Sequence, residues 1–162
     1  MRRPISWTAR LIALLLPLAL MAGALGSQFI GGLYPCEMCH WQRWPHYAAI
    51  VLAALAFVVP AASVQRLLVL LAAIAIGVSG AIGVFHAGVE YHWWQGFTEC
   101  TSTMHGSGGT PAEMLARIMN APVVRCDVPQ WSLFGISLAG FNALFSLAGA
   151  ATIFWLMRKR SS

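Results

Sequence analysis

The residues with the most distinctive chemistry are two cysteines separated by two other residues, in the segment Cys36-Glu37-Met38-Cys39. A disulfide that closes so short a loop gives little of the usual stabilisation, because the effect of a crosslink on the unfolded chain grows with loop length. Closely spaced thiols instead favour exchange chemistry, since a helix start or a nearby cation makes one of them a better nucleophile. The spacing therefore predicts a redox-active pair.

Arg43 is the one basic residue beside this pair, and it follows Cys39 by four positions. If the segment is helical, side chains four residues apart lie on one face. The guanidinium would then stabilise a thiolate on Cys39. The alternative role for Arg43 is contact with a lipid phosphate at the membrane interface.

The other two cysteines, Cys100 and Cys126, lie far apart in the second half of the chain. One interpretation is a structural disulfide between them. The other is a second redox pair whose sulfurs reach Cys36 and Cys39, since exchange requires direct attack of one sulfur on another. The residues alone leave both interpretations open.

The kind of fold that must position these cysteines is indicated by the apolar composition of the chain. Hydrophobic residues make up 59% of the 162 residues, and charged residues only 9%. Soluble domains have about 45–50% apolar and about 25% charged residues. So small a charged fraction cannot cover a water-soluble globule, and we expect lipid to face much of this chain. The length indicates one membrane domain over residues 1–162, without a separate soluble module.

Four apolar runs are visible, and a membrane-spanning helix needs about 20 residues. The runs cover approximately residues 11–33, 44–60, 67–85 and 133–157. The second run is short and extends back through Trp41 and Trp44. Only helices satisfy their own backbone in lipid. We therefore predict an all-α integral membrane protein, a four-transmembrane-helix bundle with two loops on one side, at about 31–44 and 86–131.

Basic residues are concentrated on the opposite side from these two loops. The seven are Arg2, Arg3, Arg10, Arg66, Arg158, Lys159 and Arg160. The positive-inside rule makes their side cytoplasmic. This predicts a multi-pass inner-membrane protein with both termini in the cytoplasm and every cysteine in a periplasmic loop, where disulfides persist. The net charge of +5 is thus a topology signal, and it forms no patch that would bind nucleic acid.

The first apolar run also has features of a cleaved signal peptide. Arg2 and Arg3 precede it, and small residues follow its centre, as at a cleavage site. The run continues past Gly26 to Leu33, which is long for a signal sequence, and its removal would leave three spans. We expect the segment to remain as the first span.

The second loop contains one predicted helix. Thr110 and Glu113 form a capping-box pattern, with Pro111 at the first helical position. Apolar residues then recur on one face as far as Asn120. The pattern predicts a short amphipathic helix over about 111–120, which either lies in the membrane interface or packs on the bundle.

Small and polar residues inside the apolar runs indicate helix contacts. Gly77, Gly80 and Gly83 recur every three residues, which favours close approach of a neighbouring helix. Asn142 is polar within the fourth run. We expect it to form an interhelical hydrogen bond, with a cofactor contact as the alternative.

The sequence around the cysteines resembles the signature of the DsbB family of disulfide bond formation proteins. The residues that carry the resemblance are Pro35, Cys36, Cys39, Gln42 and Arg43, together with Cys126, which is followed by Trp131, Gly135 and the fourth run. Four apolar runs, a closely spaced pair in the first loop and a widely spaced pair in the second extend it over essentially the whole chain. This combination is specific, whereas a Cys-x-x-Cys pair alone is not.

The resemblance implies a protein-dithiol:quinone oxidoreductase that reoxidises a periplasmic thioredoxin-fold oxidase resembling DsbA. Cys100 would receive the attack of the reduced partner, and Cys126, once freed, would attack Cys36. Cys39 would then be the thiolate that meets a bound quinone, ubiquinone or menaquinone, beside Arg43. The electrons would leave for the membrane quinone pool.

Three alternatives use the same residues. Cys36, Cys39 and His40 satisfy the Cys-x-x-Cys-His pattern of covalent haem attachment. The cysteines could instead bind a metal together with His40, His86, His92 or His105. A third alternative is a membrane scaffold with two structural disulfides and no electron transfer.

Overall fold

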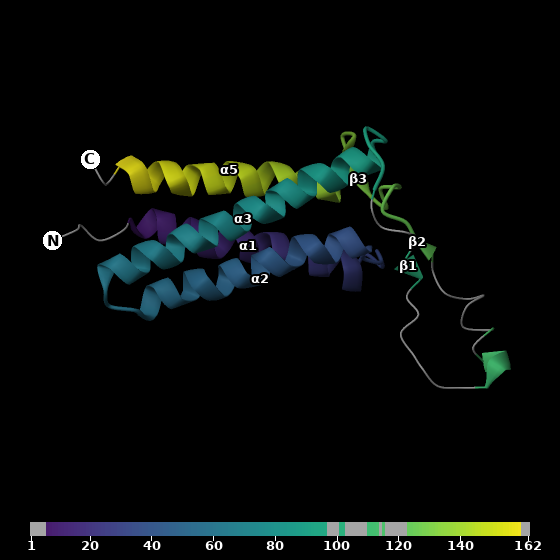
Figure 1. Cartoon of the computed structure of the whole chain (residues 1–162), viewed down its shortest axis with the longest axis horizontal. Coiled ribbons are helices and arrows are strands. Elements are labelled where there is room, and N and C mark those ends of the chain that lie inside the picture. Colours follow the sequence, from purple (N-terminus) through teal and green to yellow (C-terminus); the bar gives the residue numbers. More distant parts are fainter. Residues whose placement is uncertain (1–5, 97–100, 103–109, 114, 116–122, 160–162) are drawn as a thin grey trace.

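The computed structural model describes residues 6–96, 101–102, 110–113, 115 and 123–159. Its long helices are α1 (Trp7–Phe29), α2 (Glu37–Val58), α3 (Ala62–Glu90) and α5 (Leu138–Lys159). Its strands are β1 (Thr101–Ser102), β2 (Val123–Val124), β3 (Ser132–Leu133) and β4 (Ile136–Ser137), which pair antiparallel as β1–β2 and β3–β4. The helices run alongside one another as a bundle, with both termini and the α2–α3 turn at one end and the strands at the other, here called the strand end (Figure 1).

The mostly helical fold predicted from the sequence is confirmed. Among the described residues, α1, α3 and α5 are long and apolar enough to cross a membrane. Helix α2 has 22 residues, but its first turns carry polar side chains such as Gln42, Arg43 and His46. These polar residues lower its apolar character, so the fourth crossing stays a prediction.

The helices differ in extent from the predicted apolar runs. Helix α1 covers Trp7–Phe29, whereas the first run was placed at about 11–33. Helix α2 begins at Glu37, further back than the predicted extension of the second run through Trp41, and Cys36 caps it by accepting a hydrogen bond from the Cys39 amide at 3.3 Å. Helix α3 continues to Glu90 instead of ending near residue 85. The β3–β4 hairpin precedes α5, which begins at Leu138. Its turn residues, Phe134 and Gly135, both have positive φ, as a two-residue hairpin turn of type I′ requires.

Alanine dominates the interior of the bundle. The buried cluster is Ala9, Ala13, Ala49, Ala53, Ala56, Val69, Ala72, Ala73, Ile76, Ala150, Ile153 and Met157. Many large apolar side chains, among them Leu15, Val51, Val78, Phe145 and Trp155, point outward and are exposed. Small residues inside and large apolar residues outside are the arrangement expected where lipid covers the outer surface.

Close approach of α3 and α5 at glycine is confirmed. A Cβ atom on Gly83 would lie 3.0 Å from both the Ala139 carbonyl oxygen and the Ala143 nitrogen. At Gly80 it would lie 2.9 Å from Leu147. The absence of a side chain lets the backbones of the two helices meet at Gly83 and leaves room for the Leu147 side chain at Gly80.

The capping box in the second loop is also present. The Thr110 amide donates to the Glu113 carboxylate at 2.9 Å, and the Glu113 amide donates to the Thr110 hydroxyl at 3.4 Å. Residues 111–113 and 115 are helical. The rest of the predicted helix, Met114 and residues 116–120, lies outside the described residues.

Candidate redox site

The closely spaced cysteine pair lies at the N-terminus of α2. Cys36 is the N-cap residue and is 3% exposed, and Cys39 is in the first helical turn. The two sulfurs are 3.0 Å apart, and both thiols are free. Only a small movement would bring these sulfurs to the length of a disulfide bond. The positive end of the helix dipole favours negative charge at this position.

Cys126 lies beside this pair. Cys36, Met38, Val89 and Val124 form a buried apolar cluster, against which Cys39 and Cys126 pack. The contacts of Cys36 with the thiols of Cys126 and Cys39, together with burial, raise the pKa of the Cys36 thiol. The structure thus brings together three of the four predicted redox residues.

Cys100, the fourth, lies outside the described residues. The next residue, Thr101, begins β1 and pairs through its backbone with Val124 in β2. Val124 is buried in the cluster that adjoins the cysteines. The β1–β2 pairing therefore attaches the segment that follows Cys100 to the segment that carries Cys126.

Arg43 is buried inside the bundle and does not point outward. The side chain is 9% exposed, and its guanidinium donates to the Gln28 side-chain oxygen at 2.6 Å and to the Ala24 carbonyl at 3.3 Å, both on α1. Arg43 and Cys39 line the same two cavities. This placement fits the predicted pairing of cation and thiolate better than a contact with lipid phosphate.

Two cavities meet at Cys39. The larger, about 200 Å³, lies between α1, α2 and α5, with mostly apolar walls and the polar residues Gln42, Arg43, His46 and Asn142. The smaller, about 60 Å³, opens on the strand side and is lined by Tyr34, Cys36, His86, Glu90 and Trp131 among others. Cys39 and Arg43 line both, so the same sulfur faces the thiol cluster and the space within the bundle.

A polar network crosses the bundle at the depth of the larger cavity. Asn142 on α5 bonds to the Gln42 side chain at 2.8 Å and to the His46 ring at 2.9 Å, both on α2. It also donates to the carbonyl of Ser79 on α3 at 3.2 Å. The predicted interhelical role of Asn142 is confirmed, and the residue joins three helices.

His86 and Glu90 belong to the site although the sequence analysis gave neither a redox role. The His86 Nε2 atom lies 3.5 Å from the Cys36 sulfur and 3.8 Å from a Glu90 oxygen, and both side chains are buried. Glu90 also accepts a hydrogen bond from the Ser137 hydroxyl. The four-residue spacing of His86 and Glu90 at the end of an apolar run was the signal available in the sequence.

The metal and haem alternatives can be compared with this geometry. Cys36, Cys39 and His86 place their potential ligand atoms within 4.8 Å of one another, which is close enough to share an ion. His40, the axial ligand of the haem alternative, is exposed. The cavity beside Cys36 is about 60 Å³, which suits water molecules and not a porphyrin.

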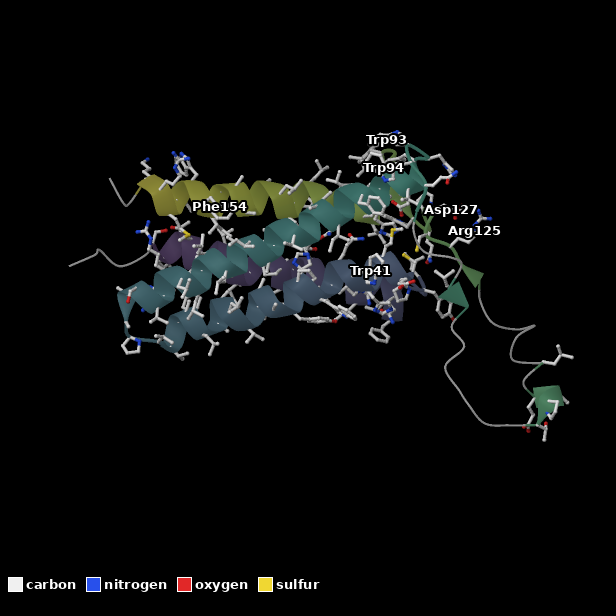
Figure 2. All side chains as sticks on the ribbon, viewed as in Figure 1. Trp41, Trp93, Trp94, Arg125, Asp127 and Phe154 are labelled. Carbon is white, nitrogen blue, oxygen red and sulfur yellow. The ribbon has the colours of Figure 1, made fainter. Side chains whose placement is uncertain are left out.

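Aromatic and charged side chains surround the strand end. Trp93, Trp94, Arg125 and Asp127 lie there in Figure 2. Arg125 pairs with Asp127 and lowers the pKa of that carboxyl group. Aromatic residues at the end of a bundle are typical of a membrane–water interface.

The fold and the site define a class, a helical membrane protein with a cluster of thiols at one end of its bundle. Residues 6–156 match the family described as disulfide bond formation protein DsbB, and the chain belongs to that family. The chain is also 22% identical over 138 residues to the uncharacterized protein RP370 of Rickettsia prowazekii (strain Madrid E), a match that covers 85% of this chain and 79% of that protein. No solved structure matches the chain significantly.

Proposed function

We propose that the protein is a dithiol:quinone oxidoreductase that reoxidises a periplasmic thioredoxin-fold oxidase and passes the electrons to ubiquinone or menaquinone. The observation that carries this proposal is the position of Cys39. Its sulfur is 3.0 Å from that of Cys36 and borders the cavity between α1, α2 and α5. One residue can thus receive electrons from the thiol cluster and release them inside the bundle.

The electrons would pass through two cysteine pairs. A thiolate of the partner attacks Cys100 and breaks a Cys100–Cys126 disulfide, which frees Cys126 as a thiolate. Cys126 then attacks Cys36, breaks the Cys36–Cys39 bond and leaves Cys39 as the thiolate. The packing of Cys126 against the Cys36 cluster supports this order. The second thiol of the partner then displaces Cys100 from the mixed disulfide, and the Cys100 thiolate attacks Cys126 and releases Cys36. Cys36 and Cys39 re-form their disulfide as the electron pair leaves to the quinone, so that overall one dithiol and one quinone become one disulfide and one quinol.

The larger cavity has the properties expected of a quinone site. Its walls are largely apolar, as a prenylated ring requires, and its polar residues are few and grouped. The Nδ1 atom of His46 is buried and has no hydrogen-bond partner among the described residues. Arg43 would donate to an oxygen of the quinone, and the Nδ1 atom of His46, an acceptor when the ring proton is on Nε2, would accept from a hydroxyl of the quinol. A quinone bound there supplies the two-electron acceptor that the protein side chains lack.

We also propose that α2 is the fourth crossing of a single membrane domain and that the strand end faces the periplasm. Arg10, Arg66, Arg158 and Lys159 belong to the end that holds both termini and the α2–α3 turn (Figure 1). The cysteines are at the other end. By the positive-inside rule the basic end is cytoplasmic.

Thiol labelling tests this function. Purified protein is incubated anaerobically with a reduced thioredoxin-fold dithiol, quenched with an alkylating reagent and mapped by mass spectrometry. We expect Cys39 to be alkylated without quinone and protected when ubiquinone is added before the quench. Alkylation of Cys39 that does not respond to quinone would contradict the proposal.

The metal alternative is favoured by one specific observation, the closeness of the Cys36, Cys39 and His86 ligand atoms. It predicts stoichiometric zinc in the purified protein and unreactive thiols at Cys36 and Cys39. Elemental analysis of the same sample separates the two functions. The visible spectrum of that sample would reveal a haem.

A further inference from the structure

The position of the proton on His86 follows from a chain of hydrogen bonds that begins on α5. Asn142 Nδ2 lies 3.2 Å from the carbonyl oxygen of Ser79. A carbonyl can only accept, so this atom is the amide nitrogen of Asn142. The Asn142 oxygen then accepts from the Ser146 hydroxyl at 3.0 Å and from His46 Nε2 at 2.9 Å. The orientation of the Asn142 side chain is thus fixed.

The orientation of Asn142 fixes that of Gln42, which contacts His86. The Asn142 nitrogen donates to Gln42 Oε1 at 2.8 Å, which leaves Gln42 Nε2 as a donor. That nitrogen donates to the Met38 carbonyl at 3.3 Å and to His86 Nδ1 at 2.7 Å. Nδ1 of His86 is therefore an acceptor, and the ring proton of neutral His86 resides on Nε2.

The protonated nitrogen faces the reacting sulfur. His86 is 2% exposed, and its Nε2 atom lies 3.5 Å from Cys36 Sγ. The same nitrogen is 3.8 Å from Glu90, whose other oxygen accepts from Ser137. The Glu90 carboxyl group therefore adds to the preference for a proton on Nε2.

We propose that His86 is a catalytic hydrogen-bond donor that stabilises the thiolate of Cys36, and that Gln42 and Asn142 are positioning residues that keep the ring proton on Nε2. The proposal rests on the proposed function. When the Cys100 thiolate attacks the sulfur of Cys126, a Cys100–Cys126 bond forms and the Cys36–Cys126 bond breaks. The electron pair of the broken bond stays on Cys36, and no proton is transferred. His86 then donates to the new thiolate.

The surroundings of Cys36 explain why such a donor is needed. The titratable groups that face it among the described residues are Tyr34, Cys39, Arg43, His86, Glu90, Arg125 and Cys126. The two thiols and burial raise the pKa of the Cys36 thiol, so without a donor Cys36 would be a poor leaving group near neutral pH. Hydrogen bonds to charged groups are stronger than those between neutral groups.

The first test is ¹⁵N NMR of the histidine rings in the detergent-solubilised full chain. We expect His86 to be protonated on Nε2 in the unsubstituted protein, and to lose this single form in Gln42→Met and in Asn142→Leu. His92→Gln changes an exposed histidine outside the network and should leave the His86 signals unchanged. A proton on Nδ1 in the unsubstituted protein, or no change in Gln42→Met, would overturn the proposal.

The second test measures the acidity of Cys36 directly. The variant Cys39→Ser/Cys100→Ser/Cys126→Ser leaves Cys36 as the single thiol of the chain, and its alkylation rate is followed against pH. Adding His86→Phe should move the midpoint about one pH unit upward and slow alkylation about tenfold below it, because a donor to a charged sulfur is lost. His86→Gln, which keeps a donor, should restore part of the shift. Profiles that do not respond to His86 would contradict the role.

Neither test uses a quinone or a partner dithiol. A failure of quinone reduction with both tests positive would therefore overturn the proposed function and leave the His86 network in place. Normal quinone reduction with both tests negative would overturn the role of His86 alone.

Discussion

At the scale of single residues, Cys39 and Arg43 occupy consecutive turns of α2 and border the same two cavities. The helix N-terminus and the guanidinium both favour negative charge at the Cys39 sulfur. Arg43 is held in turn by Gln28 and Ala24 of α1. We therefore propose two functions for Arg43, stabilisation of the thiolate and binding of the quinone.

Arg43→Ala should raise the quinone concentration that gives half the maximal rate by about tenfold, because a charge-assisted hydrogen bond to the ring oxygen is lost. Arg43→Lys keeps the charge and should show a smaller effect. The measurement is a quinone titration of dithiol oxidation, with circular dichroism to verify folding. A titration unchanged in Arg43→Ala would leave this residue with a structural role only.

The raised pKa of the Cys36 thiol makes the stability of the reduced protein depend on pH. Because the folded-state pKa lies above the ordinary value of 9.0, this thiol contributes stability that is fully present below pH 9.0 and is lost as the pH rises further. The melting temperature of the fully reduced protein should fall above pH 9.0, and Cys36→Ala should reduce that fall. Equal slopes in the two proteins would contradict the assigned pKa direction.

At the scale of elements, the contact of α3 with α5 depends on the backbone atoms that meet at Gly83. Gly83→Ala should destabilise the protein by about 1–3 kcal/mol, since its Cβ would lie 3.0 Å from two backbone atoms of α5 that cannot move independently. Gly77→Ala is the matched control, because its Cβ would meet Ala150 at an ordinary 3.7 Å. Denaturant unfolding of both variants measures the difference, and equal stabilities would contradict the packing described.

The helical class, the glycine contacts and the interhelical bond of Asn142 were predicted from the sequence. In lipid, long apolar runs form helices, and isolated polar or small residues within them lie at helix contacts. The start of α2 was not predicted, since cysteine is an uncommon N-cap and polar residues in the first turns hid the helix. The site around His86 was missed for a different reason. The four-residue spacing of His86 and Glu90 is visible in the sequence. Their closeness to Cys36, however, depends on how α2, α3 and α5 pack.

At the scale of the whole molecule, the proposed orientation places the thiol cluster and the basic residues on opposite sides of the membrane. In a cysteine-free variant, Arg66→Cys near the start of α3 should react with a membrane-impermeant thiol reagent only after the inner membrane is broken. Thr110→Cys, an exposed position in the second loop, should react in intact cells whose outer membrane is permeable. Labelling of Arg66→Cys in such intact cells would reverse the orientation.

The fold also keeps the thiol cluster, which would receive an electron pair, apart from the larger cavity, which would release it. Thiols meet at the strand end, and the larger cavity lies among apolar helices, with Cys39 at the boundary between them. A soluble dithiol and a lipid-soluble quinone would therefore never need to meet. The proposed function depends on this separation of the dithiol site from the quinone site.

The most direct test of this claim is the anaerobic absorbance of ubiquinone mixed with purified protein and a reduced thioredoxin-fold dithiol. We expect that the oxidised-quinone band disappears at one quinone per dithiol, that the protein is required, and that folded Cys39→Ser protein is inactive. An unchanged band with folded protein and several quinones and dithiols, or full activity in Cys39→Ser, would contradict the claim.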